Sequence, residues 1–415
     1  MSVAPVAITW AVAGLLAALL LPRTRRRRLA ALVPLAASVA AFLSQGGGAD
    51  LSAVAAPGGL LLGHSAAALV LLCALAATLC LVLSPPPDGG EVLVFATCGA
   101  VSAVALASGS PLVWGICFVA GGALFGVRWV AAAPARATLA AARVATLGAA
   151  ALAAASPFLP VDVASVSPRA HLAGGLLAGG IAAGLGLLPF GGWISGGARL
   201  LRGPALAPWA LLLLPALLLT VQPLQAVLPA DARGTLGAIL LPAGAISAVW
   251  AAARGLSAAD GERYNRVLMA DLGLVAMGLA TPLPGARLGS LLLMLSHLFV
   301  GPLLLQDPSS APPRPRRVAW AAVSGLPPAP AFWGRFALVT ALTTSFGGTL
   351  LLAALPVIGA VLVISLRATV SATAVASAPA ASAPSVRLAA WVPPLAAVTV
   401  GLLPSTALHA LLGVG

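Results

Sequence analysis

The sequence contains no lysine, so all 22 of its basic side chains are arginines. Acidic side chains are also scarce: nine occur among 415 residues, and charged residues make up 7% of the chain. A soluble globular protein carries about 25% charged residues to cover its surface. With 60% hydrophobic residues and a mean hydropathy of +1.07, this chain cannot face water over most of its length. The composition excludes soluble enzymes, secreted disulfide scaffolds and disordered tails, and it predicts an all-α polytopic membrane protein.

Cysteine is scarce as well, and its four copies form no metal-binding or redox pattern. Cys73, Cys80, Cys98 and Cys117 lie inside apolar runs without CxxC spacing, which is typical of small core side chains. The longest polar loop, 307–316, is too short to house a nucleotide or a flavin. We therefore expect no metal and no cofactor. A net charge of +13 would suggest nucleic acid in a soluble protein, but here we expect lipid bilayer and no nucleic-acid partner.

Apolar runs of spanning length are abundant. A spanning helix needs about 20 apolar residues, or about 17 at the short end, and this predicts about fourteen spans. They lie at 4–22, 29–44, 60–84, 92–109, 111–131, 139–159, 172–189, 205–228, 235–253, 266–283, 288–306, 317–344, 346–367 and 388–413.

The arginines predict how these spans are oriented. Seventeen arginines fall in loops on one side of this arrangement, three in loops on the other side, and two inside spans. Arginine in a membrane protein marks the cytoplasmic side. The distribution therefore predicts a multi-pass protein of the cell (inner) membrane with both termini outside.

Two hydrophobic segments are unsuited to a continuous helix. In the first, 187–204, Pro189 removes a backbone donor and several glycines lower the helix propensity. In the second, 324–336, Gly325 precedes Pro327 and Pro328 in the middle of a long apolar run. In lipid, freed backbone groups must be satisfied by protein or water. We expect a surface loop for 190–203 and a true break within the membrane for 324–336.

The second break resembles a known motif. The run VSGLPPAPAFWGRFALVTAL, residues 323–342, is similar to a motif of the antiporter-like membrane subunits of respiratory complex I, related hydrogenases and multisubunit cation/proton antiporters. The matching residues are Gly325, Leu326, Pro327, Pro328, Phe332, Trp333 and Arg335, with Ala331 in place of a second glycine.

Three weaker matches occur in the right order. Residues 292–305 resemble the helix that carries a central histidine, here His297, and residues 260–273, which include Asp271, resemble the basic entry of the preceding helix. Residues 185–208 resemble the loop with Pro189, Phe190 and Trp193.

The resemblance implies an antiporter-like fold with discontinuous helices in a single transmembrane domain, 1–415. Its parts would be the first helices (1–110), a repeat core (about 111–367) and a C-terminal helix (388–413). It also implies other membrane subunits of a complex I-like assembly as partners.

The chain departs from this family along the central line of proton-carrying side chains. The family has a Glu in the fifth helix, a Lys in each of the seventh and eighth, and a Lys or Glu in the twelfth. Here the fifth-helix position falls near Ala120 or Gly121, the seventh on Gly184, and the Lys expected after His297 on Gly301. The eighth span offers only two glutamines near its outer end.

Arg335 alone remains of that line, and arginine is a permanent charge rather than a switch. At this depth it needs a partner. Asp271, near the cytoplasmic end of the tenth predicted span, is the candidate; the alternative is that each side chain snorkels to the surface or pairs with another subunit. His297 is either a proton relay or a neutral histidine bonded to a freed carbonyl.

These residues favour a membrane-arm subunit of an NADH-quinone oxidoreductase-type, proton-translocating complex. It would have no redox catalysis of its own, and its proton line would be degenerate, which leaves a structural or half-channel role. Two alternatives stay open. One is a stand-alone secondary transporter of an uncharged or anionic solute, and the other is a pumping subunit that still works through His297 and water chains.

Overall fold

The computed structural model describes residues 6–13, 32–43, 64–83, 89–108, 110–132, 148, 150, 151, 153–155, 168–190, 207–218, 221, 228–306, 312–374 and 384–403. Its first half contains α3 (Leu32–Leu43), α4 (His64–Leu83), α5 (Gly89–Ala107), α6 (Pro111–Ala132), α8 (Pro168–Leu185) and the π-helical turn η4 (Trp209–Leu213). Its second half contains α11 (Ala230–Leu256), α12 (Asp260–Leu279), α13 (Pro284–Leu304), α14 (Pro313–Ser324), α15 (Pro330–Phe346), η5 (Gly348–Leu350), α16 (Leu351–Ala374), α17 (Pro384–Ala389) and α18 (Val392–Leu402).

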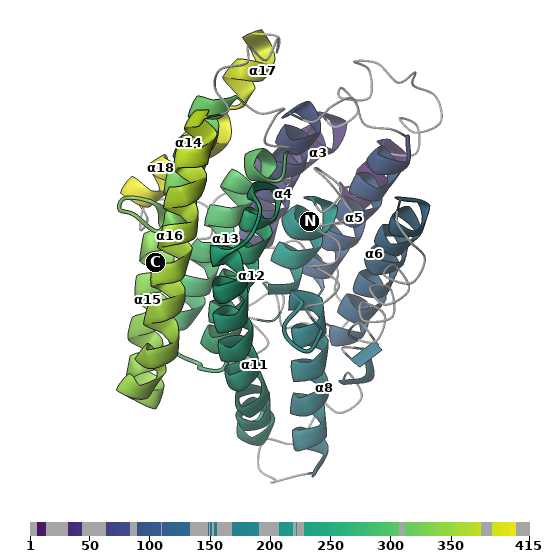
Figure 1. Ribbon diagram of the computed structural model, residues 1–415. Helices are drawn as coiled ribbons and strands as arrows, with labels where there is room; N and C mark the ends of the chain where they lie inside the picture. The colour runs from purple at the N-terminus through teal and green to yellow at the C-terminus, as the bar shows by residue number, and fades with distance from the viewer. Residues whose placement is uncertain are drawn as a thin grey trace.

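The long helices run side by side in one bundle (Figure 1). The early helices α3 to α6 lie on one side, α15, α16 and α18 lie on the other, and α11, α12 and α13 lie between them. Among the described residues, three helices are long and apolar enough to cross a membrane by length and composition: 230–256, 284–304 and 348–372. Six shorter apolar helices accompany them. The number of spans and the side of the termini stay predictions.

Glycines let the central helices approach closely. A Cβ atom on Gly273 of α12 would lie 2.6 Å from the carbonyl oxygen of Gly244 in α11. A Cβ atom on Gly289 of α13 would lie 2.7 Å from the carbonyl oxygen of Gly334 in α15. Small residues at such crossings allow backbone contact between membrane helices. Asp271 lies two residues before Gly273 and Arg335 directly follows Gly334, so each charged side chain lies beside one of these close crossings.

The predicted span 317–344 is broken in the middle. Its first half is α14, which ends at Ser324, and Gly325 then takes a left-handed φ of 84°. The second half, α15, begins at Pro330, a residue that is favourable in the first turn of a helix because it lacks an N–H. The true break that the Gly-Pro pattern predicts at 324–336 is therefore present.

The first predicted break, after α8, begins with the same glycine–proline spacing as the break after α14. Helix α8 ends at Leu185, and Gly186 has a φ of 66°. Pro189 follows Gly186 by three residues, just as Pro328 follows Gly325 by three. Ser247 of α11 accepts a hydrogen bond on its hydroxyl oxygen from the freed N–H of Leu188 at 2.8 Å. The surface loop predicted for 190–203 lies outside the described residues from position 191 on.

Two sequence expectations need correction. The tenth helix begins at Asp260 rather than near residue 266, so Asp271 is the twelfth of its twenty residues and lies at the middle of α12, not near an end. The C-terminal helix expected over 388–413 is described as two pieces, α17 and α18, which meet at residues 390 and 391.

Candidate functional site

An ion pair joins Asp271, in the middle of α12, to Arg335, in the second turn of α15. The guanidinium of Arg335 donates from Nε to Oδ1 of Asp271 at 3.0 Å and from Nη2 to Oδ2 at 2.7 Å. Side-chain exposure is 3% for Arg335 and 1% for Asp271. Such bidentate geometry is the strongest form of arginine–carboxylate pair. The structure therefore joins the two residues rather than sending each to the membrane surface.

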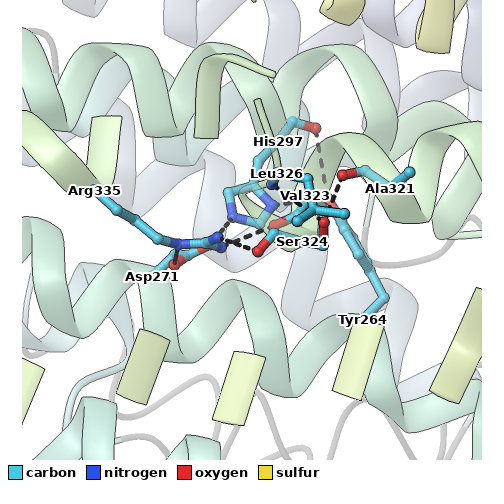
Figure 2. A network of polar contacts seen from close by, with 8 residues as sticks. All are labelled: Tyr264, Asp271, His297, Ala321, Val323, Ser324, Leu326 and Arg335. Carbon is cyan, nitrogen blue, oxygen red and sulfur yellow. Dashed lines mark hydrogen bonds and ion pairs between the residues drawn. The ribbon is translucent and has the colours of Figure 1, made fainter. Parts of the chain in front are cut away.

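Arg335 also satisfies the broken end of α14 (Figure 2). It donates from Nη1 to the carbonyl of Ser324 at 2.8 Å and from Nη2 to the carbonyl of Val323 at 2.9 Å. The last carbonyls of a helix have no partner within the helix, and a cation at that end is favoured by the helix dipole. Arg335 thus acts as the cap of the half-helix α14 as well as the partner of Asp271.

His297 of α13 completes the cluster at Oδ2 of Asp271, the same oxygen that Nη2 of Arg335 contacts. Its Nε2 lies 2.8 Å from Oδ2 of Asp271, and its side chain is 4% exposed. Its Nδ1 lies 3.4 Å from the hydroxyl of Tyr264, which is also 3.4 Å from the carbonyl oxygen of His297 itself. An imidazole that donates from Nε2 to Asp271 can accept from Tyr264 at Nδ1. The four side chains thus form one buried chain, Tyr264–His297–Asp271–Arg335.

The residues of the broken-helix motif shape the surroundings of this chain rather than joining it. Gly325 is required twice, because its φ is left-handed and because a Cβ atom there would overlap Nη1 of Arg335. Pro327 and Pro328 form the turn, and Gly401 of α18 packs directly on the carbonyl of Pro328. Trp333 donates from Nε1 to the carbonyl of Gly401 at 3.0 Å, and Phe332 contacts the rings of Trp333 and Phe336.

The first motif contributes nothing to the buried chain among the described residues. Pro189 and Phe190 lie in the turn after α8, where Phe190 is partly buried against the core. Trp193 lies outside the described residues.

Tyr264 is the member of the buried chain that the sequence did not identify. It is the only tyrosine in the chain, it is buried in the second turn of α12, and its ring meets that of Trp320 edge-on at 6.3 Å. A Cβ atom on Gly301 would lie 3.1 Å from the Tyr264 hydroxyl. The phenol therefore occupies space next to the position where the resemblance places a lysine. Its uniqueness in the composition was the available signal.

Gly121 and Gly184 also lie at or next to positions where the resemblance places charged side chains, and neighbouring side chains occupy the space beside them. A Cβ atom on Gly121 would lie 2.8 Å from Cδ2 of Leu213, and one on Gly184 would lie 2.5 Å from Cδ2 of Leu217. Leu211 reaches Gly301 in the same way, at 2.8 Å. All three leucines come from one helical segment, 207–218, and all are buried. No group of three or more potential metal ligands occurs among the described residues.

Comparison by sequence finds no relative: no protein-family model matches the chain, and no curated protein matches it. Comparison by structure does. A chain of respiratory complex I from Thermus thermophilus with bound aureothin is similar over 100% of both chains, with a TM-score of 0.78 at 19% identity. A chain of the Mrp complex from Dietzia sp. DQ12-45-1b has a TM-score of 0.78 at 16% identity, over 99% of this chain and 51% of the other.

A chain of a third kind of membrane complex is also similar in structure. A chain of the membrane-bound sulfane sulfur reductase, an archaeal respiratory membrane complex, has a TM-score of 0.75 at 14% identity, over 99% of this chain and 96% of the other. At these identities the likeness concerns the fold. The chain has the fold of the antiporter-like membrane subunits found in respiratory complex I and related complexes, as the motif at 323–342 predicted.

Proposed function

We propose that this chain, with its antiporter-like fold, is a membrane-arm subunit of a multi-subunit complex of the respiratory or antiporter type, in which the proton line has been replaced by apolar packing. Its partners would be other membrane subunits, and any redox chemistry would belong to them. The whole chain, 1–415, would form one multi-pass transmembrane domain in the cell (inner) membrane, with a repeat core over about 111–367.

The filling of the three glycines is the observation that carries this proposal. The resemblance implies a charged side chain near Ala120 or Gly121, at Gly184 and at Gly301. The space beside Gly121, Gly184 and Gly301 holds Leu213, Leu217 and the pair Leu211 and Tyr264. A proton path needs side chains or waters that can hold a proton, and leucine offers neither a site nor room for water. In this proposal, side chains of the helical segment 207–218 occupy the space that the proton-carrying side chains would need, so tertiary packing excludes a proton path there.

The Arg335–Asp271 pair supports the same conclusion. A proton switch must exist in two charge states, but a guanidinium keeps its proton even when it is buried. Four of its N–H bonds already point at Asp271, Val323 and Ser324. The same contacts argue against a stand-alone transporter in which Arg335 binds an anionic solute, since the solute would have to displace the carboxylate and two backbone carbonyls.

One observation favours a second candidate, a subunit that still moves protons through His297. Histidine is the side-chain type that most often serves as a proton shuttle, and His297 contacts both Asp271 and Tyr264. It would pass a proton between the phenol side and the carboxylate side of the site. The contact geometry allows this half-channel, while the leucine filling opposes a continuation through the first half of the molecule.

Two measurements separate these functions. A tagged full-length chain, extracted from its native membrane in mild detergent, should bring other membrane subunits with it; recovery of the chain alone would favour the stand-alone transporter. In vesicles, the isolated chain should show no cation exchange driven by a pH gradient, and such exchange would contradict the loss of the proton line.

The half-channel is tested in the intact assembly. Under our first proposal, His297→Ala leaves proton pumping unchanged, as does the control Ser296→Ala, which alters the neighbouring buried side chain. A severalfold loss of pumping in His297→Ala alone would establish the second candidate instead.

A further inference from the structure

Two arginines flank one helix crossing at the end of the bundle where α11 stops and α12 begins. Gly255 of α11 packs so closely on α16 that a Cβ atom there would lie 2.5 Å from Cδ1 of Ile364. Arg254 directly precedes Gly255. Arg367, about one turn beyond Ile364, donates from Nη1 to the carbonyl of Leu256 at 3.0 Å. We call this place, with Arg254 and Arg367 at its centre, the α11–α16 corner.

The corner carries positive charge that its surroundings do not compensate. Both arginines are exposed, and in the described part of the chain neither has a carboxylate partner. The two acids nearby already have partners: Asp260 pairs with Arg263 at 2.6 Å, and Glu262 lies 3.8 Å from Arg266. Arg263 also donates to Ser371 of α16 at 3.1 Å, which ties the start of α12 to the same place.

Apolar side chains lead away from the two arginines toward the middle of each helix. On α11, Val249 and Ile246 precede Arg254 by one to two turns, and both are exposed. On α16, Leu366 and Val363 precede Arg367 and are likewise exposed. By helical spacing, Ile246 and Leu366 lie on the sides of α11 and α16 that face away from the Gly255–Ile364 crossing. The exposed apolar side chains therefore cover the outer faces of two touching helices, and we call these two faces, which lie below the two arginines, the apolar strip.

We propose that the α11–α16 corner binds an anionic phospholipid, with the phosphate between Arg254 and Arg367 and the acyl chains along the apolar strip. Guanidinium groups bind phosphate oxygens in a planar, directional way, and basic side chains between helices at the membrane surface recognise anionic headgroups. The order of groups, charged at the helix end and apolar toward the centre, matches an amphiphile in a bilayer. A zwitterionic headgroup brings its own cation, so it gains less from two uncompensated arginines. This site is independent of the proposed function.

The test measures lipid that stays on the protein. The full-length chain is placed in bilayers of phosphatidylcholine with roughly one quarter phosphatidylglycerol, extracted in mild detergent, and its retained lipid is quantified by mass spectrometry. One arginine at an anionic surface is worth about 1 kcal/mol, so Arg254→Gln and Arg367→Gln should each lower retained phosphatidylglycerol about fivefold.

Arg314→Gln is the matched control. Arg314 is an exposed arginine in the first turn of α14, which begins at the same end of the bundle, and it belongs to neither helix of the corner. It should leave retention unchanged. An equal loss in Arg314→Gln would mean attraction to surface charge only, and equal retention of phosphatidylcholine would mean contact through the acyl chains only; either overturns the site. A photo-crosslinker at Leu366 should capture lipid in the intact assembly, and capture of protein alone would assign the corner to a partner subunit.

Discussion

At the scale of single residues, Arg335 performs two tasks that are usually separate. It neutralises Asp271 in the middle of the bundle, and it caps the carbonyls of Val323 and Ser324 at the end of α14. A buried ion pair is weak evidence for stability by itself, because desolvation opposes the attraction between the charges. Here the same guanidinium also satisfies backbone groups that the helix break leaves without partners, which gives the charge a structural reason to be buried.

Removal of one partner should show this dependence. Asp271→Asn leaves Arg335 with a buried, uncompensated charge, and we expect it to lower the free energy of unfolding by about 3–5 kcal/mol. Arg335→Met should cost at least as much, since two carbonyls also lose their donor. Because the two residues interact directly, the double variant should be less destabilised than the sum of the single variants by about 2 kcal/mol.

Unfolding by denaturant in detergent micelles measures these values, with Asp231→Asn in the first turn of α11 as the control that removes an acid outside the buried cluster. That control should change stability by less than about 0.5 kcal/mol. Strictly additive costs in the double variant would show that Asp271 and Arg335 do not depend on each other.

The sequence predicted which residues belong to this site better than it predicted their contacts. Asp271, His297 and Arg335 stood out because charged or titratable side chains are rare in apolar helices. Their contacts depend on how three helices cross, and the pair is 64 residues apart in the chain. Tyr264 is unique in the composition, but its place beside Gly301 and His297 depends on the packing of α13 against α12, which the sequence does not give.

At the scale of elements, the break between α14 and α15 is held from two sides. Arg335 supports the end of α14 from within the bundle, while α18 packs against the turn through the contact of Gly401 with Pro328 and the hydrogen bond from Trp333. Glycine and proline predicted this break because both disfavour helix, whatever the tertiary context. The start of α12 was harder to predict because its first residues, Asp260 to Arg263, are polar. Acids in a first turn nevertheless favour a helix N-terminus.

Gly325 is the position where the break is most easily tested. An alanine there meets a left-handed conformation, which costs about 1–2 kcal/mol, and its Cβ also overlaps Nη1 of Arg335. In the wild-type background, we expect Gly325→Ala to lower the free energy of unfolding by more than this conformational cost alone. In an Arg335→Met background, we expect it to lower the free energy of unfolding by the conformational cost only. Denaturant unfolding of the four variants measures the difference.

The control for the glycine test is Gly175→Ala in α8, where an added Cβ has no neighbour within 4 Å. It should be neutral or stabilising by up to about 1 kcal/mol, because alanine is the better helix former. If Gly325→Ala lowers the free energy of unfolding equally in both backgrounds, then overlap between the new Cβ atom and Arg335 does not contribute to the cost.

At the scale of the whole molecule, one helical segment packs against three of the glycines at or near the positions where the resemblance places charged side chains. Residues 207–218 send Leu211, Leu213 and Leu217 toward glycines on three other helices, α13, α6 and α8. The absence of lysine from the sequence predicts that the line is lost, which stays a prediction, and it does not indicate which side chains lie beside these glycines. Composition reports which side chains are missing, whereas the filling depends on packing between segments that are distant in the chain.

This filling predicts an unusual response to restoring a charge. Gly184→Lys should destabilise the fold strongly, because the new side chain overlaps Leu217 and would be buried without a partner. Leu217→Ala alone should cost about 2–5 kcal/mol, as deletion of a buried leucine does. The double variant, Gly184→Lys with Leu217→Ala, should be more stable than Gly184→Lys alone. The truncation of Leu217 frees the space that the aliphatic part of the lysine side chain needs. The folded fraction after size-exclusion chromatography in detergent measures the order of the three variants.

The double variant should still conduct no protons in vesicles, because Gly121 and Gly301 continue to face Leu213 and Leu211. A double variant less stable than Gly184→Lys would mean that Leu217 does not fill the lysine position. Proton conduction by the double variant would mean that one restored side chain suffices and that the remaining leucines do not block the path. The predicted combination, rescue of the fold without rescue of transport, follows only if the proton line was lost through the packing of the whole molecule rather than at a single residue.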